Sequence, residues 1–256
     1  MSTPVLELKE ATIRFGGLVA VNKVSFDLPK GILFGLIGPN GAGKTTCFNL
    51  ITGVYNPTEG DILFHGERIN GLAPHKIARK GICRTFQNIR LFKSMSVLEN
   101  VVVGGFLRHK TGLMSAITYM PWSVNETEQL KEEAMELLKV VDLQKVANTR
   151  SSDLPYGMQR RLEIARAMAT KPDLLLLDEP AAGMNPLEKA DLQNTVRRIR
   201  DEFDKTVLLI EHDMRFVMGL CETIVVLDHG EEIARGNPDE IRNNPKVIEA
   251  YLGEPV

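Results

Sequence analysis

One eight-residue run constrains this 256-residue chain more than any other feature. It follows the apolar residues 32–37 and precedes residues 46–52, which we expect to form a helix. Its residues are Gly38, Pro39, Asn40, Gly41, Ala42, Gly43, Lys44 and Thr45. Glycines let the backbone curl so that successive N–H groups face one anion, and the following helix adds the positive end of its dipole. The run therefore predicts a phosphate-binding loop, with Lys44 at the β- and γ-phosphates and Thr45 as a magnesium ligand.

Two later apolar runs end in side chains that can act on a phosphate. Residues 174–177 are four leucines followed by Asp178 and Glu179, and residues 207–210 are followed closely by His212. Unbroken apolar runs of this length are typical of strands buried on both faces of a parallel sheet. In open α/β sheets ligands bind at the carboxyl ends of the strands, so both ends and the phosphate loop are expected to share one crevice.

These three side chains have distinct predicted roles. Asp178 would hold Mg²⁺ through water, Glu179 would polarise the attacking water, and His212 would donate a hydrogen bond to the γ-phosphate. An Asp-Glu pair after a strand is otherwise often a helix cap, and a single histidine is often structural. The order of phosphate loop, acidic strand end and histidine strand end favours the functional interpretation, most of all for Asp178 and Glu179.

The segment upstream of the acidic strand narrows the class of protein. Residues 154–168 resemble the signature motif and signature helix of the ABC-transporter ATPases. The signature positions are Leu154, Pro155, Tyr156, Gly157, Met158 and Gln159. Gln87 looks like the Q-loop glutamine of that family, Asn185 lies in a segment that looks like its D-loop, and Phe15 sits where the family stacks an aromatic ring on adenine. The motifs follow the family's order along essentially the whole chain.

The resemblance implies an α/β fold of the P-loop NTPase type. Its parts would be a RecA-like parallel-sheet core, an antiparallel β-subdomain and a helical subdomain that carries the signature. One ABC ATPase domain would span residues 1–256, with the core and β-subdomain in about 1–90 and 166–256 and the helical subdomain in about 91–165. The implied cofactors are ATP and Mg²⁺, with Gln87 as a further magnesium ligand. The implied ATP contacts are Phe15, Gln87, Thr46 and the whole phosphate loop.

Local patterns place two further elements. Extended apolar runs in residues 5–24 and 62–64 fit the antiparallel subdomain. Residues 123–126 read Ser-Val-Asn-Glu and match a capping box, after which apolar residues recur at helical spacing. These residues are Leu130, Ala134, Leu137, Leu138 and Val141. A helix is therefore expected to begin near Ser123.

Within the family, the sequence looks most like the ATP-binding subunits of branched-chain amino acid importers. The likeness lies in the Tyr-Gly pair of the signature, the Ala-Ala-Gly-Met-Asn-Pro form of residues 181–186, and the ending at residues 243–253. It implies an ATP hydrolase that works as a homodimer or a heterodimer with a sibling subunit. The dimer would dock on two membrane permeases at the cytoplasmic face of the inner or plasma membrane, with a substrate-binding protein as an indirect partner.

Other functions share parts of this pattern. Urea or amide import, lipid or lipopolysaccharide export, and a non-transport ABC ATPase all remain open at this point. A P-loop kinase would have no use for the signature segment. Non-transport ABC ATPases usually carry two cassettes, or a coiled-coil or zinc-bearing insert, whereas this chain carries one cassette, which favours transport.

The signature departs from the usual Leu-Ser-Gly-Gly-Gln of the family at Pro155 and Met158. Proline has neither a side-chain hydroxyl nor a backbone N–H. In the family, two chains dimerise head to tail and each signature completes the ATP site of the other. We therefore expect this signature to contribute weakly and the chain to pair with a sibling that carries a stronger one. Asn185 stands where aspartate is commoner, which puts coupling between subunits through this position in doubt.

Composition agrees with a soluble subunit. No apolar stretch approaches the ~18 residues that a membrane helix needs, so a transport function would use a pore made by other chains. A net charge of −2 argues against a nucleic-acid surface, which normally carries a basic stripe. The three cysteines are odd in number and show no paired spacing, which fits a reducing cytoplasm. Cys47, close to Lys44, is interpreted first as a small buried apolar residue.

Overall fold

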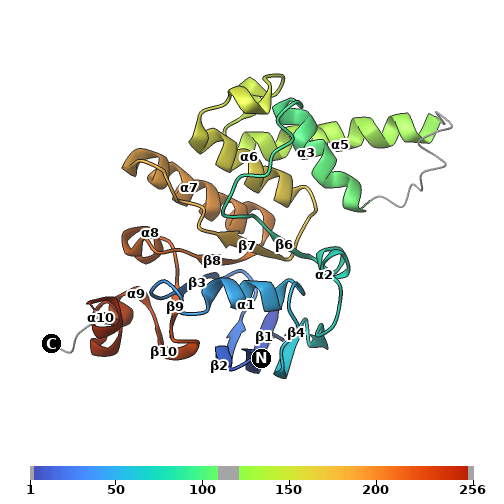
Figure 1. Ribbon diagram of the computed structural model, residues 1–256. Coiled ribbons are helices and arrows are strands. Elements are labelled where there is room, and N and C mark those ends of the chain that lie inside the picture. Colours follow the sequence, from blue (N-terminus) through green and yellow to red (C-terminus); the bar gives the residue numbers. More distant parts are fainter. Residues whose placement is uncertain (1–2, 109–120, 253–256) are drawn as a thin grey trace. The chain divides into compact units, whose positions relative to one another are not determined.

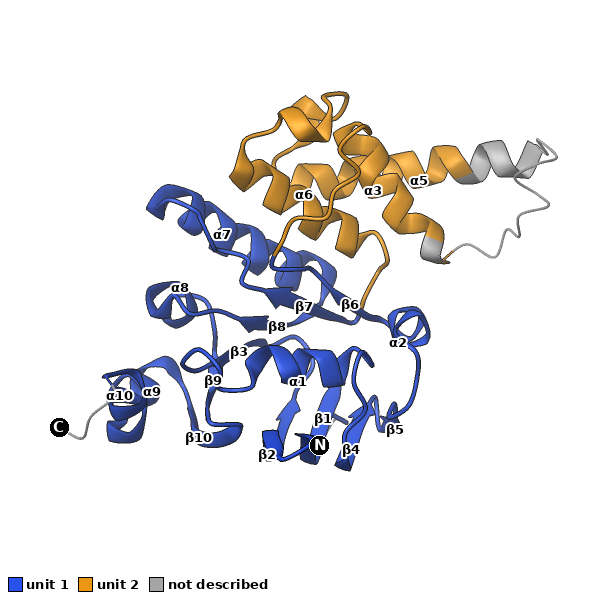
Figure 2. Ribbon diagram, in the orientation of Figure 1, with its two compact units in different colours: residues 1–87, 173–256 blue, residues 88–172 orange. Residues whose placement is uncertain are grey.

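The computed structural model describes residues 3–108 and 121–252. The chain divides into two compact units, residues 1–87 with 173–256 and residues 88–172 (Figure 2). The two sheets lie in the first unit, and the second unit is helical. The α/β class and the separate helical part were both expected from the sequence.

The larger sheet of the first unit has six strands in the order β10-β9-β3-β8-β7-β6 (Figure 1). All neighbours are parallel except β9 and β10. The strands are β3 (Leu33–Ile37), β6 (Ile82–Arg84), β7 (Leu174–Asp178), β8 (Thr206–Ile210), β9 (Thr223–Asp228) and β10 (Glu231–Gly236). Every residue of β3, β7 and β8 is buried, which confirms the prediction of strands covered on both faces.

The smaller sheet is antiparallel and has the order β2-β1-β4-β5. Its strands are β1 (Leu6–Phe15), β2 (Leu18–Leu28), β4 (Glu59–Phe64) and β5 (Glu67–Arg68). The predicted antiparallel part is confirmed, and β2 extends to Leu28 rather than ending at Val24. The two strands β1 and β2 pair along most of their length because residues 16 and 17 form a tight Gly-Gly turn between them.

Helix α1 (Lys44–Ile51) lies between the two sheets of the first unit (Figure 1). Its residues Cys47, Phe48, Leu50 and Ile51 join one apolar core with side chains from both sheets. Because this face of α1 is buried, Lys44, the first residue of the helix, is held in a fixed position. The helix begins earlier than the predicted residue 46 because the last residue of the glycine loop, Gly43, already serves as its N-cap.

Five more helices complete the described part of the first unit. They are α2 (Pro74–Lys80), α7 (Pro186–Phe203), α8 (Met214–Met218), α9 (Pro238–Arg242) and α10 (Pro245–Leu252). Three begin at side-chain caps: Asn185 for α7, Asp213 for α8 and Asn237 for α9. Each cap accepts hydrogen bonds from N–H groups that the first turn cannot satisfy itself.

The helical unit is built on α3 (Val97–Gly105), α5 (Pro121–Val140) and α6 (Tyr156–Met168). Short 3₁₀ turns accompany them at Phe106–Arg108, Gln144–Val146 and Ser151–Asp153. Helix α3 packs against both α5 and α6. The expected boundary near residue 165 falls inside α6, which continues to Met168, so the compact helical unit extends to residue 172.

One expectation for this unit was wrong. Residues 123–126 do not cap a helix, because α5 already includes them and begins no later than Pro121. The helical spacing itself is confirmed, since Leu130, Ala134, Leu137 and Leu138 are buried residues of α5. A capping box does occur in this unit, at Ser96 and Glu99 before α3, where each side chain bonds the backbone N–H of the other.

Within the two described stretches of chain, no helix combines the length and the apolar character needed to cross a bilayer.

Replacing Ser96 by alanine should lower the free energy of unfolding by about 1 kcal/mol, because the N–H of Glu99 loses its acceptor at the start of α3. Urea denaturation followed by circular dichroism measures this loss. Ser152→Ala is the matched control, since that exposed hydroxyl donates to the neighbouring Asp153 carboxylate and caps no helix. Equal stability of the two variants would contradict the capping role.

Candidate nucleotide site

The glycine loop joins β3 directly to α1 and depends on glycine at two places. A Cβ on Gly38 would lie 2.1 Å from the carbonyl oxygen of Leu227, and one on Gly43 would lie 2.6 Å from that of Ala20. Both glycines also have positive φ, at 149° and 97°. Gly43 is the N-cap of α1 and offers no side-chain acceptor, so the first N–H groups of the helix are left to a ligand.

Lys44 closes this loop on itself. Its ammonium donates to the carbonyl oxygens of Gly38 and Pro39, both at 2.8 Å. Burial lowers the pKa of Lys44, and the negative charge of Glu179 opposes this shift. The lysine is thus held over the loop, where an anion that binds the N–H groups would also meet its charge.

A groove of about 650 Å³ runs along the loop and gathers many of the predicted nucleotide contacts. Its lining residues are Phe15, Leu18, Val19, Ala20, Asn40, Gly41, Ala42, Gly43, Lys44, Thr45, Thr46, Glu179 and His229. Phe15 is 44% exposed and packs edge-on against Tyr55, with ring centroids 5.2 Å apart. An exposed aromatic ring at one end and a phosphate-type loop at the other suit a nucleotide, whose base can stack while its phosphates bind N–H groups.

The acidic pair lies where β7 ends, as the sequence predicts. Glu179 has a φ of 46°, and its Oε2 accepts a hydrogen bond from Nε2 of Gln87 at 2.9 Å. Nδ1 of His212 lies 3.8 Å from the same Oε2, and the histidine side chain is 58% exposed. Three residues that are distant in sequence, Gln87, Glu179 and His212, therefore meet at one carboxylate.

Asp178 is 5% exposed and is paired with a residue that the sequence analysis missed. Its Oδ2 accepts a hydrogen bond from Nη2 of Arg84 at 2.6 Å. Nothing in the spacing around Arg84 indicates a role, because its partner lies far away in the sequence.

Glu211 is a second missed residue, and it organises the strand ends. Its fully buried carboxylate accepts N–H groups from Ala181 at 2.7 Å, His212 at 3.1 Å and Asp213 at 3.4 Å. Burial raises the pKa of this carboxyl, and the N–H donors oppose the shift. Glu211 thus ties the segment after β7 to the segment after β8, which positions His212 next to Glu179. The sequence feature that could have indicated its importance is its position directly after the apolar run 207–210.

The predicted magnesium residues supply the kinds of atom that Mg²⁺ prefers. Asp178 offers a carboxylate, Thr45 a hydroxyl and Gln87 an amide oxygen, and oxygen donors suit this hard cation. In the part of the chain that the structure describes, no cluster of three or more His, Cys, Asp or Glu side chains could hold a metal. Mg²⁺ usually binds through one or two carboxylates together with substrate phosphates.

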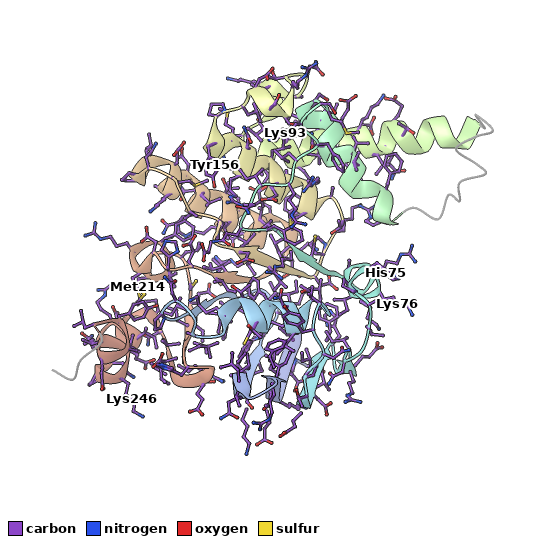
Figure 3. All side chains as sticks on the ribbon, viewed as in Figure 1. His75, Lys76, Lys93, Tyr156, Met214 and Lys246 are labelled. Carbon is purple, nitrogen blue, oxygen red and sulfur yellow. The ribbon has the colours of Figure 1, made fainter. Side chains whose placement is uncertain are left out.

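The signature segment begins α6 in the helical unit. Leu154 is buried, Pro155 is the N-cap of α6 without a side-chain hydrogen bond, and Gln159 donates from Nε2 to the Leu154 carbonyl at 2.8 Å. Gly157 is buried and Met158 is partly buried. Tyr156 is 45% exposed at the start of the helix (Figure 3). Its hydroxyl accepts from Nη2 of Arg160 at 3.0 Å.

Asn185, the predicted D-loop residue, has a local structural role. Its Oδ1 accepts the N–H of Glu188 at 3.0 Å, and Glu188 accepts the N–H of Asn185 at 2.9 Å, which makes a capping box for α7. Asparagine and aspartate cap helices about equally well, so asparagine here keeps the capping function.

Cys47 is fully buried in α1, and burial raises its thiol pKa to about 12. None of the three cysteines, all of which lie among the described residues, forms a disulfide.

Comparison with protein families identifies the family to which this set of motifs belongs. Residues 21–182 match the ABC transporter family, and residues 231–256 match the family described as branched-chain amino acid ATP-binding cassette transporter. The chain is 50% identical over 254 residues to the high-affinity branched-chain amino acid transport ATP-binding protein BraF of Pseudomonas aeruginosa. It is 48% identical over 254 residues to LivG of Escherichia coli, a protein of the same description. In both cases the match covers 99% of this chain and 100% of the relative.

Solved structures agree with these matches. The ADP conformation of MJ1267, an ATP-binding cassette of an ABC transporter, aligns with a TM-score of 0.85 and 32% identity, over 98% of this chain and 99% of that one. The dimeric post-hydrolysis state of the cassette MJ0796, bound to ADP and phosphate, aligns with a TM-score of 0.75 and 25% identity, over 91% of this chain and 98% of that one.

Gly43→Ala should weaken nucleotide binding by about tenfold or more, because the added Cβ meets the Ala20 carbonyl and strained backbone costs on the order of 1–3 kcal/mol. Titration with a fluorescent ATP analogue measures this change. Gly17→Ala is the control, since a Cβ there meets nothing within 4 Å. Parent-like affinity of the Gly43 variant would remove the argument that this loop geometry binds the phosphates.

Proposed function

The chain belongs to the ABC transporter family of ATP-binding proteins, and from this premise we propose that it binds and hydrolyses ATP to power a branched-chain amino acid importer. The observation that carries the cargo assignment is identity of 48–50% to importer subunits along 99% of the chain. The match of residues 231–256 to the branched-chain family adds support from a segment outside the general cassette.

ATP binding is assigned to the groove along the glycine loop. The adenine would stack on Phe15, and the phosphates would take the loop N–H groups and the ammonium of Lys44 in place of the carbonyls it now holds. Thr46, which lines the same groove beside Thr45, would add a hydrogen bond.

Hydrolysis is assigned to the carboxylate of Glu179. It would orient and polarise a water molecule for attack on the γ-phosphate, while His212 donates to the phosphate oxygens. Bound Mg²⁺, held by Thr45, Asp178 and Gln87, would neutralise charge on the phosphates. The hydrogen bond between Gln87 and Glu179 supports a coupled pair, because a ligand that draws Gln87 away also releases the catalytic carboxylate.

The working unit is proposed to be a dimer docked on two membrane permeases at the cytoplasmic face, with a substrate-binding protein as an indirect partner. The dimer of the related cassette MJ0796 supports pairing, and the descriptions of the relatives support a transporter complex. The partner ATPase is proposed to be a sibling subunit, since the signature here offers no side-chain oxygen at Pro155. In such a pair Leu154, Tyr156, Gly157, Met158 and Gln159 would line the site of the partner's ATP through backbone groups.

Replacing Glu179 by glutamine should lower the ATP turnover rate by roughly 10²-fold or more while ATP binding persists, because an amide cannot act as a base. Steady-state phosphate release and ATP titration measure the two quantities. Glu202→Gln is the control, since Glu202 is an exposed residue of α7 whose carboxylate pairs with Arg198 at the surface. A near-parent rate in the Glu179 variant would sink the catalytic assignment.

The same Glu179→Gln variant tests the transport assignment when it is tagged and purified from native membranes with ATP. Recovery of two hydrophobic permeases and a second ATPase is the expected result, and uptake of radiolabelled leucine should fail in cells that carry the variant. Recovery of ribosomal or DNA-bound proteins, or leucine uptake at the parent rate, would contradict the importer function.

Replacing Pro155 by serine should raise ATP turnover several-fold in the assembled transporter, because serine restores a hydroxyl and an N–H at the start of α6. Pro155→Ala separates the two, since it restores only the N–H. If the serine variant turns over ATP no faster than the alanine variant, the missing hydroxyl at position 155 does not limit the ATP turnover rate.

A further inference from the structure

A buried arginine accompanies the proposed magnesium residue. Arg84 is the last residue of β6, and its side chain is 10% exposed. Nη2 donates to Oδ2 of Asp178 at 2.6 Å, and Nη1 donates to Oδ1 of Asn49 in α1 at 2.7 Å. The guanidinium therefore joins three elements of the first unit at the point where β7 ends.

The surroundings of this guanidinium are largely apolar. It lies 5.4 Å from the ring centroid of Phe48 and 5.6 Å from that of Phe86. Its Nε is buried and has no hydrogen-bond partner among the residues that the structure describes. A charge in such a place is costly to bury unless an opposite charge compensates it, and Asp178, itself 7% exposed in its side chain, is the carboxylate that does so.

The neighbours of Arg84 hold the same strand end. The hydroxyl of Thr85 accepts the N–H of Asp178 at 3.4 Å, and Gln87 donates to Glu179 at 2.9 Å. The chain from β6 into the Gln87 segment thus runs along the acidic pair and contacts both members. Within this set, Arg84 is the residue that brings a full positive charge to Asp178.

We propose that Arg84 is the counter-ion of Asp178 in the nucleotide-free protein and prevents Mg²⁺ from binding there without ATP. The inference rests on the proposed role of Asp178 in holding magnesium. Arg84 does not contact the reacting atoms and acts through Asp178, so it is a positioning residue.

The physical reason is competition between two cations at one carboxylate. A carboxylate has two oxygens, so Asp178 can keep Arg84 on one oxygen and accept a metal-bound water on the other. The arginine charge repels a divalent cation at such short range, and few water molecules screen it in a buried site. Mg²⁺ that arrives with the phosphates of ATP is held by additional oxygen ligands, which free Mg²⁺ would lack.

The test uses the purified full-length protein without nucleotide and measures the thermal unfolding midpoint with and without millimolar MgCl₂. A cation that binds the folded state raises this midpoint. The parent should show no response beyond that to NaCl of equal ionic strength. Arg84→Gln should gain a magnesium-dependent rise, because Asp178 loses its counter-ion, and Arg84→Lys should behave like the parent, because the charge is kept.

Three further variants assign the response to this pair. The double variant Arg84→Gln/Asp178→Asn should lose the magnesium response, since the carboxylate is gone. Arg200→Gln should show no response, because Arg200 pairs with Glu222, which contacts the beginning of β3 rather than its loop end. Arg84→Met keeps side-chain packing between the two rings and should respond as Arg84→Gln does.

The proposal is overturned if the parent already responds to Mg²⁺ alone, or if neither Arg84→Gln nor Arg84→Met gains a response. It is also overturned if neither variant folds even with Mg²⁺, because a counter-ion alone would be replaceable by the metal. A separate assay isolates the proposed function: magnesium-dependent ATP hydrolysis by the parent that is lost in Asp178→Asn supports that function, whatever the result for Arg84.

Discussion

The structure depends on the need to compensate carboxylates that are buried where parallel strands end. Asp178 and Glu211 leave water almost completely, and a buried charge must find a counter-charge or several hydrogen-bond donors. Asp178 has Arg84 on the neighbouring strand, and Glu211 has three backbone N–H groups. These two solutions fix the paths of the chain after β6, β7 and β8. Gln87, Glu179 and His212 follow these strands and therefore meet at the Glu179 carboxylate.

Sequence reasoning succeeded where the signal is local. The glycine loop, the four-leucine run of β7 and the apolar run of β8 each contain their structural explanation within a few residues, and the structure confirms all three as elements. Helical spacing likewise found the buried face of α5. The antiparallel sheet was recognised because its strands are long and apolar, although the extent of β2 was underestimated.

The features that sequence reasoning missed or misassigned share another cause. Arg84 matters because it pairs with a residue on a strand far along the chain, and no pattern near residue 84 announces this. The capping box was assigned to residues 123–126 because the letters match, yet the same chemistry occurs at Ser96, where the chain actually changes direction into α3. A local motif specifies residue types, and the fold determines which of several matching segments forms the corresponding structure.

The position of Lys44 has a consequence for how the loop receives an anion. Its ammonium has already left water and is held by the carbonyls of Gly38 and Pro39, so the loop is shaped before a nucleotide arrives. An incoming phosphate exchanges partners with a dehydrated cation instead of stripping water from a mobile side chain. Attraction between such partly buried charges is screened much less by dissolved ions than attraction at the surface. Affinity for the triphosphate should therefore change little with ionic strength, and the site would work alike in solutions of very different salt content.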